Sequence, residues 1–510
     1  MQAFTDLITP DPASPQPIYL QLVSKLTTLI TSGALSAGHR LPSSRELATL
    51  LGIHRKTVIR AYEELSIQGW LESHTGKGTF VATDLPGVRP RSWALPELEW
   101  REPPERARQR EKKHASVRDE KKTAGFQIPE APHLERKDPK YTFTYHLDDG
   151  LPDPRIAPLA DLARAYRAQL LTGRQYTRLG YSDPRGSSLL REVLAPYLKE
   201  TRGLNITENN LLITRGSVMG IYLISTGLIQ RDDIVVASDP TWTGAIMNFA
   251  QAGAEIMRIG SDEDGLIVDE LEDICNNHTI RLLYITSHHH YPTTIPLRPD
   301  RRLQLLNLAK RRSFIILEDD YDYDFHYENK PHLPLASVDK AAMVLYCGSF
   351  TKAISPAIRV GYIVGAENVI HHLSNLRRII DRQGDTLLEN AIAMLIQNGV
   401  IQRHLRKALK LYKERRDVFC GLLRSKLGDI VDFSVPEGGM AVWARFDPSI
   451  DLKALAEEAA KKDLFISNGH QHGTGNATRL GFASSTPEEL DEAVKILRKA
   501  APIKGSGFLK

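Results

Sequence analysis

Lys352 lies in the stretch GSFTKAISPAIRVGY, residues 348–362, with Arg359 seven positions further along the chain. A lysine that is partly desolvated and close to other cations has a lowered proton affinity and can form a Schiff base with an aldehyde. An isolated lysine is more often a surface residue. The interpretation of Lys352 as a reactive amine therefore depends on the polar residues that the fold brings to it.

Three residues in other segments have the chemistry to hold an aromatic ring. Asp319 and Tyr321 follow an apolar stretch with a spacing of two, so their side chains can share a face. A buried carboxylate is what a pyridinium nitrogen needs, and a phenol can hydrogen-bond an oxygen on the ring. Trp242 offers a flat face on which such a ring can stack.

Four further residues are suited to a phosphate group. Gly216 and Ser217 open a helical stretch directly after an apolar segment, so free amides and the helix dipole would favour an anion there. Ser349 and Arg359, on either side of Lys352, could complete this phosphate cradle with a hydroxyl and a guanidinium.

Apolar strand candidates alternate with helical stretches from about residue 141 to 510, which predicts an α/β domain with a small C-terminal subdomain from about 396. The candidates are 210–214, 233–238, 281–286, 313–317 and 343–347. Each ends in a polar or glycine-containing cluster. Ligands of open parallel sheets lie outside the carboxyl ends of the strands, so these clusters are expected to converge on one site.

Residues 12–83 predict a different unit, a winged helix-turn-helix. An amphipathic stretch begins at Ile18, and Ser43 and Glu46 form a capping box that starts a second helix, which ends at Gly52. A third helix then starts with the basic residues Arg55 and Lys56, and two strand candidates surround a glycine-rich tip. The alternative is an ordinary three-helix bundle with a solvated charged face.

Residues 84–140 are rich in Pro, Arg, Lys and Glu and poor in apolar periodicity, which predicts a flexible linker. A flexible chain of this length spans roughly 40 Å on average, about one helical repeat of DNA. Two DNA-binding domains could therefore settle independently on neighbouring half-sites. Its basic stretch could also contact phosphates, although a solvated tether is the simpler interpretation.

The stretch LPSSRELATLLGIHRKTVIRAYEELSIQGWLESHTGKGTFVA resembles the winged-helix domain of GntR-type transcription regulators. The resemblance implies that four residues contact the major groove or its phosphates and that two wing residues contact the minor groove. The first four are Arg45, Arg55, Lys56 and Thr57, and the wing residues are Gly76 and Lys77. Arg and Lys can read guanine edges or neutralise phosphates, and glycines let a wing backbone approach closely.

The motifs YHLDDGLPDPRIAPL, SDPTWTGA, EDDYDYDF, GSFTKAISPAIRVGY, EGGMAVW and TRLGFAS are similar to those of fold-type I aminotransferases. Joined to the winged helix, they resemble the MocR subfamily of GntR regulators. The resemblance implies a Schiff base between Lys352 and pyridoxal 5′-phosphate, with Asp319 at the pyridinium nitrogen, Tyr321 at the 3′-oxygen, and Ser349 and Arg359 at the phosphate. It further implies that Arg479 grips the acidic group of an amino ligand and that Tyr181 reaches the phosphate of the partner subunit.

The chain also departs from the pattern of these relatives. Residues 215–219, RGSVM, replace the usual Ser-Gly-x-Gln-Gln, so a side-chain contact to the phosphate is lost while the backbone amides remain. Residues 288–290 are three consecutive histidines, and their role against the cofactor is left open. Neighbours in an extended chain point in alternating directions, so no metal site is expected.

Composition sets the remaining limits. With 510 residues, 42% hydrophobic residues, 25% charged residues and a net charge of +4, the chain has an ordinary globular composition. No apolar run approaches the ~18 residues of a membrane helix, and no secretory signal is evident, so a cytoplasmic protein is expected. Cys275, Cys347 and Cys420 are far apart in sequence and are expected to be reduced.

The leading hypothesis is a transcription regulator whose aminotransferase-like domain senses an amino compound rather than turning it over. One alternative is a working aminotransferase with an accessory DNA-binding domain, and another is a regulator that senses pyridoxal 5′-phosphate itself. The fold-type I resemblance implies a homodimer, in which each winged helix could pack on the other chain. Two DNA-reading modules imply double-stranded promoter DNA with repeated half-sites.

Overall fold

The computed structural model describes residues 5, 7–11, 17–67, 69–74, 78–83, 124, 126–134, 143–171, 179–328, 332–472 and 476–501. The chain divides into two compact units, Met1–Ile128 and Pro129–Lys510, and each is described by itself. Most of the predicted linker, and the wing residues Gly76 and Lys77, lie outside the described residues.

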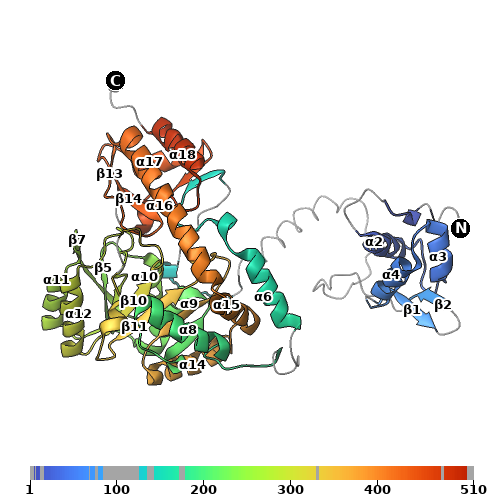
Figure 1. The fold of residues 1–510 in the computed structure, drawn as a ribbon, viewed down its shortest axis with the longest axis horizontal. Helices are drawn as coiled ribbons and strands as arrows, with labels where there is room; N and C mark the ends of the chain where they lie inside the picture. The colour runs from blue at the N-terminus through green and yellow to red at the C-terminus, as the bar shows by residue number, and fades with distance from the viewer. Residues whose placement is uncertain are drawn as a thin grey trace, which may run out of the picture. The chain divides into compact units, whose positions relative to one another are not determined.

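Among the described residues from 17 to 83 of the first unit, three helices and a hairpin follow one another in the order of a winged helix-turn-helix (Figure 1). They are α2 (Ile18–Thr31), α3 (Ser44–Leu51), α4 (Arg55–Ile67), β1 (Leu71–His74) and β2 (Gly78–Val81). The Ser43 hydroxyl accepts from the Glu46 amide at 3.2 Å, and the Glu46 side chain accepts from the Ser43 amide at 3.4 Å. This confirms the capping box, and Gly52 ends α3 with φ = 63°.

The core of this unit lies between the three helices and the hairpin. It contains fully buried Leu22 and Leu26 of α2, Leu47 of α3, and Val58 and Leu65 of α4. The strands pair antiparallel, from Leu71 opposite Val81 to His74 opposite Gly78. The apolar side chains therefore fix the first turn of α4 so that its basic residues remain in solvent.

The second unit is built on a seven-stranded sheet in the order β4-β12-β11-β10-β9-β5-β6. Its strands are β4 (Leu211–Thr214), β5 (Ile234–Ser238), β6 (Glu255–Ile259), β9 (Ile280–Ile285), β10 (Ile315–Asp320), β11 (Val344–Ser349) and β12 (Gly361–Val364). All five strand candidates of the sequence belong to this sheet. Only β12 runs antiparallel to its neighbours, and the continuous apolar runs reflect strands buried on both faces.

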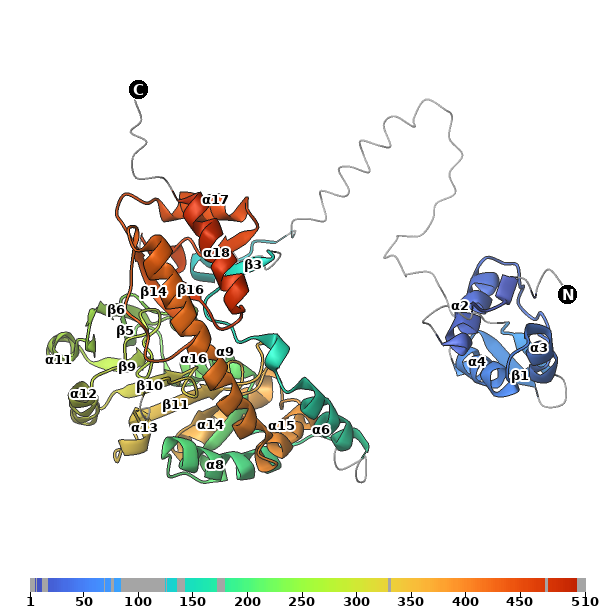
Figure 2. The ribbon, with the colours of Figure 1, turned by 45° about the horizontal axis from the view of Figure 1, so that its top comes forward.

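Helices cover both faces of the large sheet (Figures 1 and 2). Leu345 and Cys347 of β11 pack with the helices on one face, whereas Tyr346 between them belongs to the core on the other face. The first face is covered by α9 (Gly216–Leu228), α10 (Thr243–Gln251) and α14 (Glu367–Ile380). The opposite face is covered by α8 (Ser188–Arg202), α11 (Val268–Asn277), α12 (Pro299–Arg312) and α15 (Thr386–Gln397).

The long helix α16 (Val400–Leu427) leads into a smaller C-terminal part. There an antiparallel sheet of β13 (Val431–Asp432), β14 (Ala441–Phe446) and β16 (Ala477–Gly481) packs with α17 (Leu452–Ala460) and α18 (Pro487–Ala500). The strand β15 (Leu464–Ile466) pairs in parallel with β3 (Tyr145–Leu147), near the start of the unit. Segments from both ends of the unit therefore meet in this part.

Further α-helices and strands of this unit are α6 (Leu159–Leu171), α13 (Leu335–Val338), β7 (Ser261–Asp262) and β8 (Gly265–Leu266). In the described part of the chain, no helix has the length and apolar character needed to cross a membrane.

Candidate functional site

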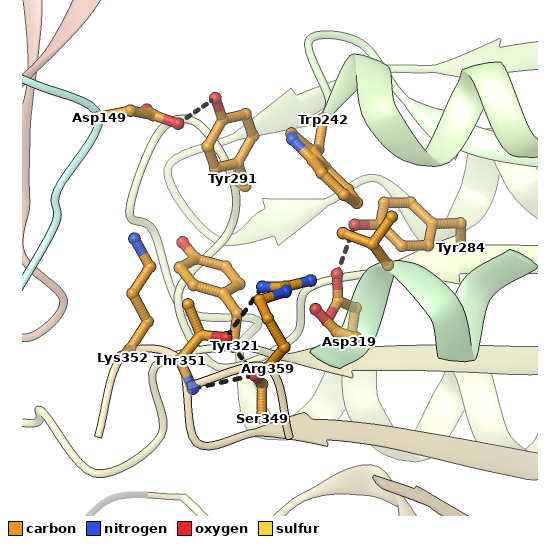
Figure 3. Close-up of a pocket in the computed structure, with 12 residues that line it drawn as sticks. Asp149, Trp242, Tyr284, Tyr291, Asp319, Tyr321, Ser349, Thr351, Lys352 and Arg359 are labelled. Carbon is orange, nitrogen blue, oxygen red and sulfur yellow. Dashed lines mark hydrogen bonds between the residues drawn. The ribbon is translucent and has the colours of Figure 1, made fainter. Parts of the chain in front are cut away.

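A cavity of about 170 Å³ lies at the carboxyl ends of the central strands. Figure 3 shows residues from several segments pointing into it. Seven predicted site residues line it: Ser217, Trp242, Asp319, Tyr321, Ser349, Lys352 and Arg359. Residues from four segments that are distant in sequence thus converge at the strand ends, as the strand-end pattern predicted.

Lys352 lies three residues after the end of β11 and reaches into one side of the cavity. Its Nζ donates a hydrogen bond to the carbonyl oxygen of Gly150. Burial lowers the pKa of Lys352, although the nearby Asp149 carboxylate opposes this effect. A lowered pKa increases the fraction of neutral amine, and the neutral amine is the form that attacks an aldehyde carbon.

Asp319, near the end of β10, lies on the opposite side of the cavity from Lys352 (Figure 3). The Tyr284 hydroxyl donates to Asp319 Oδ2 at 2.9 Å. Burial raises the pKa of Asp319 to about 7. Its Oδ1 atom is buried and has no hydrogen-bond partner among the residues that the structure describes. The Oδ1 atom of Asp319 is therefore available to accept a hydrogen bond from a donor in the cavity.

Tyr321 and Trp242 form two further walls of the cavity. The Tyr321 hydroxyl donates to the carbonyl oxygen of His289 at 3.2 Å. Trp242 is the residue immediately before α10. A Cβ atom at Gly244 would overlap the Trp242 ring, so the ring can lie against the start of α10 only because residue 244 has no side chain.

The predicted phosphate-binding residues gather in one corner. Ser349 Oγ donates to Thr351 Oγ1 at 2.8 Å, and Arg359 Nη2 donates to the carbonyl oxygen of Arg215 at 3.0 Å. Gly216, the first residue of α9, has φ = 77°, and a Cβ there would lie 2.7 Å from Arg359 Nη2. Two hydroxyls, a guanidinium and the amino end of a 13-residue helix therefore meet at this corner.

Arg479 on β16 is buried and is not among the residues that line the cavity. Its Nε lies 2.9 Å from Oδ1 of Asp149, and its Nη1 donates to the carbonyl oxygen of Pro292 at 3.0 Å. Burial raises the pKa of Asp149, an effect that Arg479, Lys352 and Tyr291 oppose. The guanidinium predicted to grip a ligand is therefore already paired with an acidic group of its own chain.

Tyr181 does not line this cavity. Its side chain is 81% exposed, and the Arg382 guanidinium lies over its ring at 4.0 Å. Its predicted contact with the phosphate of the partner subunit stays a prediction.

Five residues that line the cavity were not identified from the sequence: Asp149, Val218, Tyr284, Tyr291 and Thr351. Thr351 is adjacent to Lys352, and Tyr291 and Asp149 lie in polar loop motifs. Their positions in the sequence could therefore have identified them as candidate site residues. Tyr284 lies inside a strand whose pattern indicates only burial. Its role depends on the pairing of β9 with β10, which a single sequence does not reveal.

The three consecutive histidines have separate environments. His290 hydrogen-bonds Ser238 and Thr293, while His289 Nδ1 lies 2.9 Å from Asp322 Oδ1. The possible ligand atoms of His288, His289 and His326 lie within 4.8 Å of one another. The backbone of Gly438 packs against the His289 ring, which leaves little room beside Nε2. The expectation of no metal stays a prediction.

The predicted DNA-contacting residues lie around the starts of α3 and α4. Arg45, Arg55 and Lys56 are exposed, and Thr57 is half-buried. Arg55 Nε donates to Ser44 Oγ at 3.4 Å, which joins the two helix starts. These residues present three positive charges to solvent.

The larger unit matches a known enzyme family. Residues 153–497 match the family described as aminotransferase class I and II. A solved structure of the kynurenine aminotransferase of Pyrococcus horikoshii, in complex with PMP, is similar with a TM-score of 0.65. It is 26% identical, and the alignment covers 71% of this chain and 91% of that one.

The aminotransferase class I and II fold implies pyridoxal 5′-phosphate as the cofactor. The residues present fit this group. Asp319 Oδ1 is free to accept from a ring nitrogen, Trp242 offers a ring face, and the corner at Gly216 and Arg359 suits a phosphate. Lys352 supplies the amine on the remaining side.

The smaller unit and the whole chain match regulators. Residues 18–81 match the GntR family of bacterial regulatory proteins. The uncharacterized HTH-type transcriptional regulator YdfD of Bacillus subtilis is 30% identical over 94% of this chain and 95% of its own. The probable rhizopine catabolism regulatory protein MocR of Rhizobium meliloti is 28% identical over 97% of this chain and 96% of its own. With a GntR helix-turn-helix domain joined to an aminotransferase class I and II domain, this DNA-binding protein belongs to the MocR-type transcription regulators of the GntR family.

Proposed function

We propose that this protein binds repeated half-sites in promoter DNA through its winged helix and senses a primary amine through the cavity around Lys352. The observation that carries the proposal is the placement of Lys352 and the unpaired Asp319 Oδ1 on opposite sides of one cavity. Such a regulator acts in the bacterial cytoplasm and lies at the nucleoid when it is bound to DNA.

Pyridoxal 5′-phosphate, when bound, supplies an aldehyde carbon that condenses reversibly with primary amines. Lys352 is the amine that this chain offers, and its lowered pKa keeps a larger fraction neutral. If an effector amine took the place of Lys352, the Lys352 Nζ would have a hydrogen-bond acceptor in the carbonyl oxygen of Gly150. Asp319 would hold the ring nitrogen from the side of the cavity opposite Lys352.

Binding of the amine can change DNA affinity only if the two DNA-binding states differ in their affinity for it. Coupling of this kind is typically about 1–3 kcal/mol, which corresponds to a 5–150-fold change in DNA affinity. We infer that the freed Lys352 and its contact with the 148–151 loop differ between the two states. This loop carries both Gly150 and Asp149.

A homodimer is the proposed assembly, in which each winged helix could pack on the other chain. Leu179, Tyr181, Ile379 and Ile380 are large apolar side chains with 43–81% exposure. Arg382 lies over the Tyr181 ring and Gln383 accepts from the Ser182 amide, so the segments that carry these side chains are neighbours. Contiguous exposed apolar side chains are typical of a protein interface.

The experiment combines visible absorbance with DNA binding by the full-length protein loaded with cofactor. A DNA fragment is first selected from a random duplex pool, and its affinity is then measured with and without a panel of primary amines. We expect some amines to change the absorbance of the bound cofactor and the DNA affinity over the same concentration range. Lys352→Ala should abolish the amine response and retain DNA binding.

Two other outcomes would replace the proposal. Steady turnover of an amino donor with a keto acid, undiminished when residues 1–140 are deleted, would favour an aminotransferase. A change in DNA binding on addition of pyridoxal 5′-phosphate, with no further effect of any amine, would favour a sensor of the cofactor itself.

A further inference from the structure

The Asp149 carboxylate lies in the wall of the cavity on the same side as Lys352 (Figure 3). The Tyr291 hydroxyl donates to its Oδ2 at 2.8 Å, and Arg479 Nε lies 2.9 Å from its Oδ1. A carboxyl group, held between Tyr291 and Arg479, therefore lies on the side of the cavity where a ligand near Lys352 would place its substituents.

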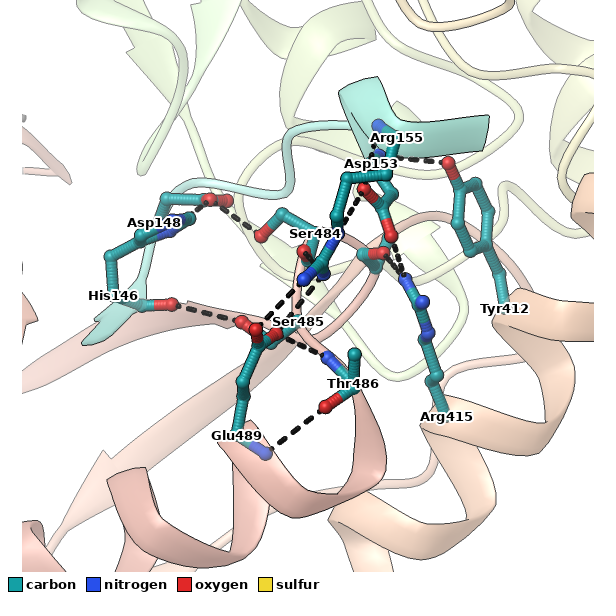
Figure 4. A network of polar contacts seen from close by, with 11 residues as sticks. His146, Asp148, Asp153, Arg155, Tyr412, Arg415, Ser484, Ser485, Thr486 and Glu489 are labelled. Carbon is teal, nitrogen blue, oxygen red and sulfur yellow. Dashed lines mark hydrogen bonds and ion pairs between the residues drawn. The ribbon is translucent and has the colours of Figure 1, made fainter. Parts of the chain in front are cut away.

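The backbone of Asp149 is also fixed. The buried Asp148 carboxylate accepts from the amides of Gly150 and Leu151 at 2.8 and 2.7 Å, and from Ser484 Oγ at 2.8 Å. Figure 4 shows the Asp148–Ser484 hydrogen bond together with a neighbouring network, in which Arg155 binds both Asp153 and Glu489. The 148–151 loop is thus tied to the C-terminal part of the unit, so Asp149 cannot swing away without breaking several hydrogen bonds.

The pairing of Asp149 changes what Arg479 can bind. Its Nε faces Asp149 and its Nη1 donates to the carbonyl oxygen of Pro292. A ligand carboxylate that approached this guanidinium would lie against the Asp149 carboxylate, and like charges at such distances repel each other strongly where water is excluded. The resemblance implied that Arg479 grips the acidic group of a ligand, and in this structure the acidic group beside it is Asp149.

We propose that the effector is a primary amine without an α-carboxylate, and that it carries a second hydrogen-bond donor, such as an ammonium group, which Asp149 accepts. A carboxylate offers about four lone-pair sites. Tyr291 uses one site on Oδ2, and Oδ1 accepts no hydrogen bond from the described residues, although Arg479 Nε lies 2.9 Å away as an ion-pair partner. The simplest ligands of this class are diamines. The inference rests on the proposed function, because it names the class of amine that the same cavity senses.

The test compares ligands that differ in one group. Putrescine is ornithine without the α-carboxylate, and butylamine is putrescine without the second amine. Each is titrated into the full-length protein loaded with cofactor, and absorbance and DNA affinity are recorded. Each absorbance response is divided by that of free pyridoxal 5′-phosphate, which reacts with amines on its own. Putrescine should act at concentrations at least about tenfold below those of ornithine and of butylamine.

Asp149→Asn should reduce the preference for putrescine over ornithine to about twofold or less. Glu272→Gln, which likewise removes an acidic partner of an arginine but in an exposed pair, should leave the preference unchanged. The cofactor absorbance of Asp149→Asn shows whether the site has folded, and the comparison of ligands on the native protein does not depend on any variant.

The outcomes separate the two proposals. If ornithine acts as well as putrescine on the native protein, or if Asp149→Asn folds and keeps the full preference, the inference about ligand class is overturned while amine sensing stands. If no amine changes either absorbance or DNA affinity, amine sensing itself is overturned, and the ligand class with it.

Discussion

The Tyr284 hydroxyl donates a 2.9 Å hydrogen bond to Asp319 Oδ2, while Oδ1 of the same buried carboxylate has no partner among the described residues. The single bond from Tyr284 offsets only part of the free energy lost on burial, so the pKa of Asp319 rises to about 7. A protonated ring nitrogen in the cavity would supply the missing donor and would favour the charged carboxylate.

The raised pKa of Asp319 predicts a pH dependence of folding stability. Between about pH 4 and 7 the folded cofactor-free protein holds a proton on Asp319 that the unfolded chain has released. Its free energy of unfolding therefore falls as the pH rises through this range, by up to about 1.4 kcal/mol per pH unit from this group. Urea unfolding of native protein and Asp319→Asn at several pH values measures the difference. Equal pH slopes for the two proteins would contradict the prediction.

Gly216→Ala is expected to weaken binding of pyridoxal 5′-phosphate by at least about tenfold. The residue has φ = 77°, and the added Cβ would lie 2.7 Å from Arg359 Nη2, so both the start of α9 and the guanidinium would shift. Titration of cofactor-free protein with the cofactor, followed by absorbance, gives the dissociation constant.

Gly421→Ala is the matched control for this substitution. Gly421 lies inside α16, and a Cβ there would meet no atom within 4 Å. We expect unchanged cofactor affinity and a gain in stability of roughly 0.5–1 kcal/mol. If both variants bound the cofactor like the native protein, the phosphate corner would be wrongly placed.

Ile379→Asp is expected to convert the proposed homodimer into monomers. Ile379 is 81% exposed and lies three residues before Arg382, which covers Tyr181. A charge placed in an apolar interface lacks a partner and is expensive to bury. Sedimentation velocity measures the assembly, and Leu303→Asp, at a leucine of α12 that is 60% exposed, should leave it unchanged. Dimers of Ile379→Asp at micromolar concentration would place the interface elsewhere.

Lys56→Ala is expected to weaken DNA binding about equally on all sequences. Lys56 is exposed in the first turn of α4, where it can neutralise a phosphate. The slope of log affinity against log salt concentration should decrease in magnitude by about 1. Lys461→Ala, at an exposed lysine of the other unit, should leave the slope unchanged. An unchanged slope for Lys56→Ala would remove this residue from the DNA-binding face.

The two folds were predictable because their local signals are strong. Ser43 and Glu46 form a capping box by spacing alone, and the apolar runs of β4, β5, β9, β10 and β11 predicted one buried sheet. The strands β6 and β12 were missed. The run that forms β12, Gly361–Val364, is short and follows the Lys352 stretch. Its place between β4 and β11 depends on tertiary pairing, which a local sequence pattern does not reveal.

The sequence by itself determined which chemistry is present: a lysine, a carboxylate and a phosphate-binding corner, each tied to the end of a strand. Only the tertiary structure decided how these groups are paired. Arg479 and Asp149 are 330 positions apart in the chain, yet the fold brings them together as an ion pair. Periodicity and caps are local properties of a chain, whereas the pairing of two buried charges depends on how β16 and the 148–151 loop pack together.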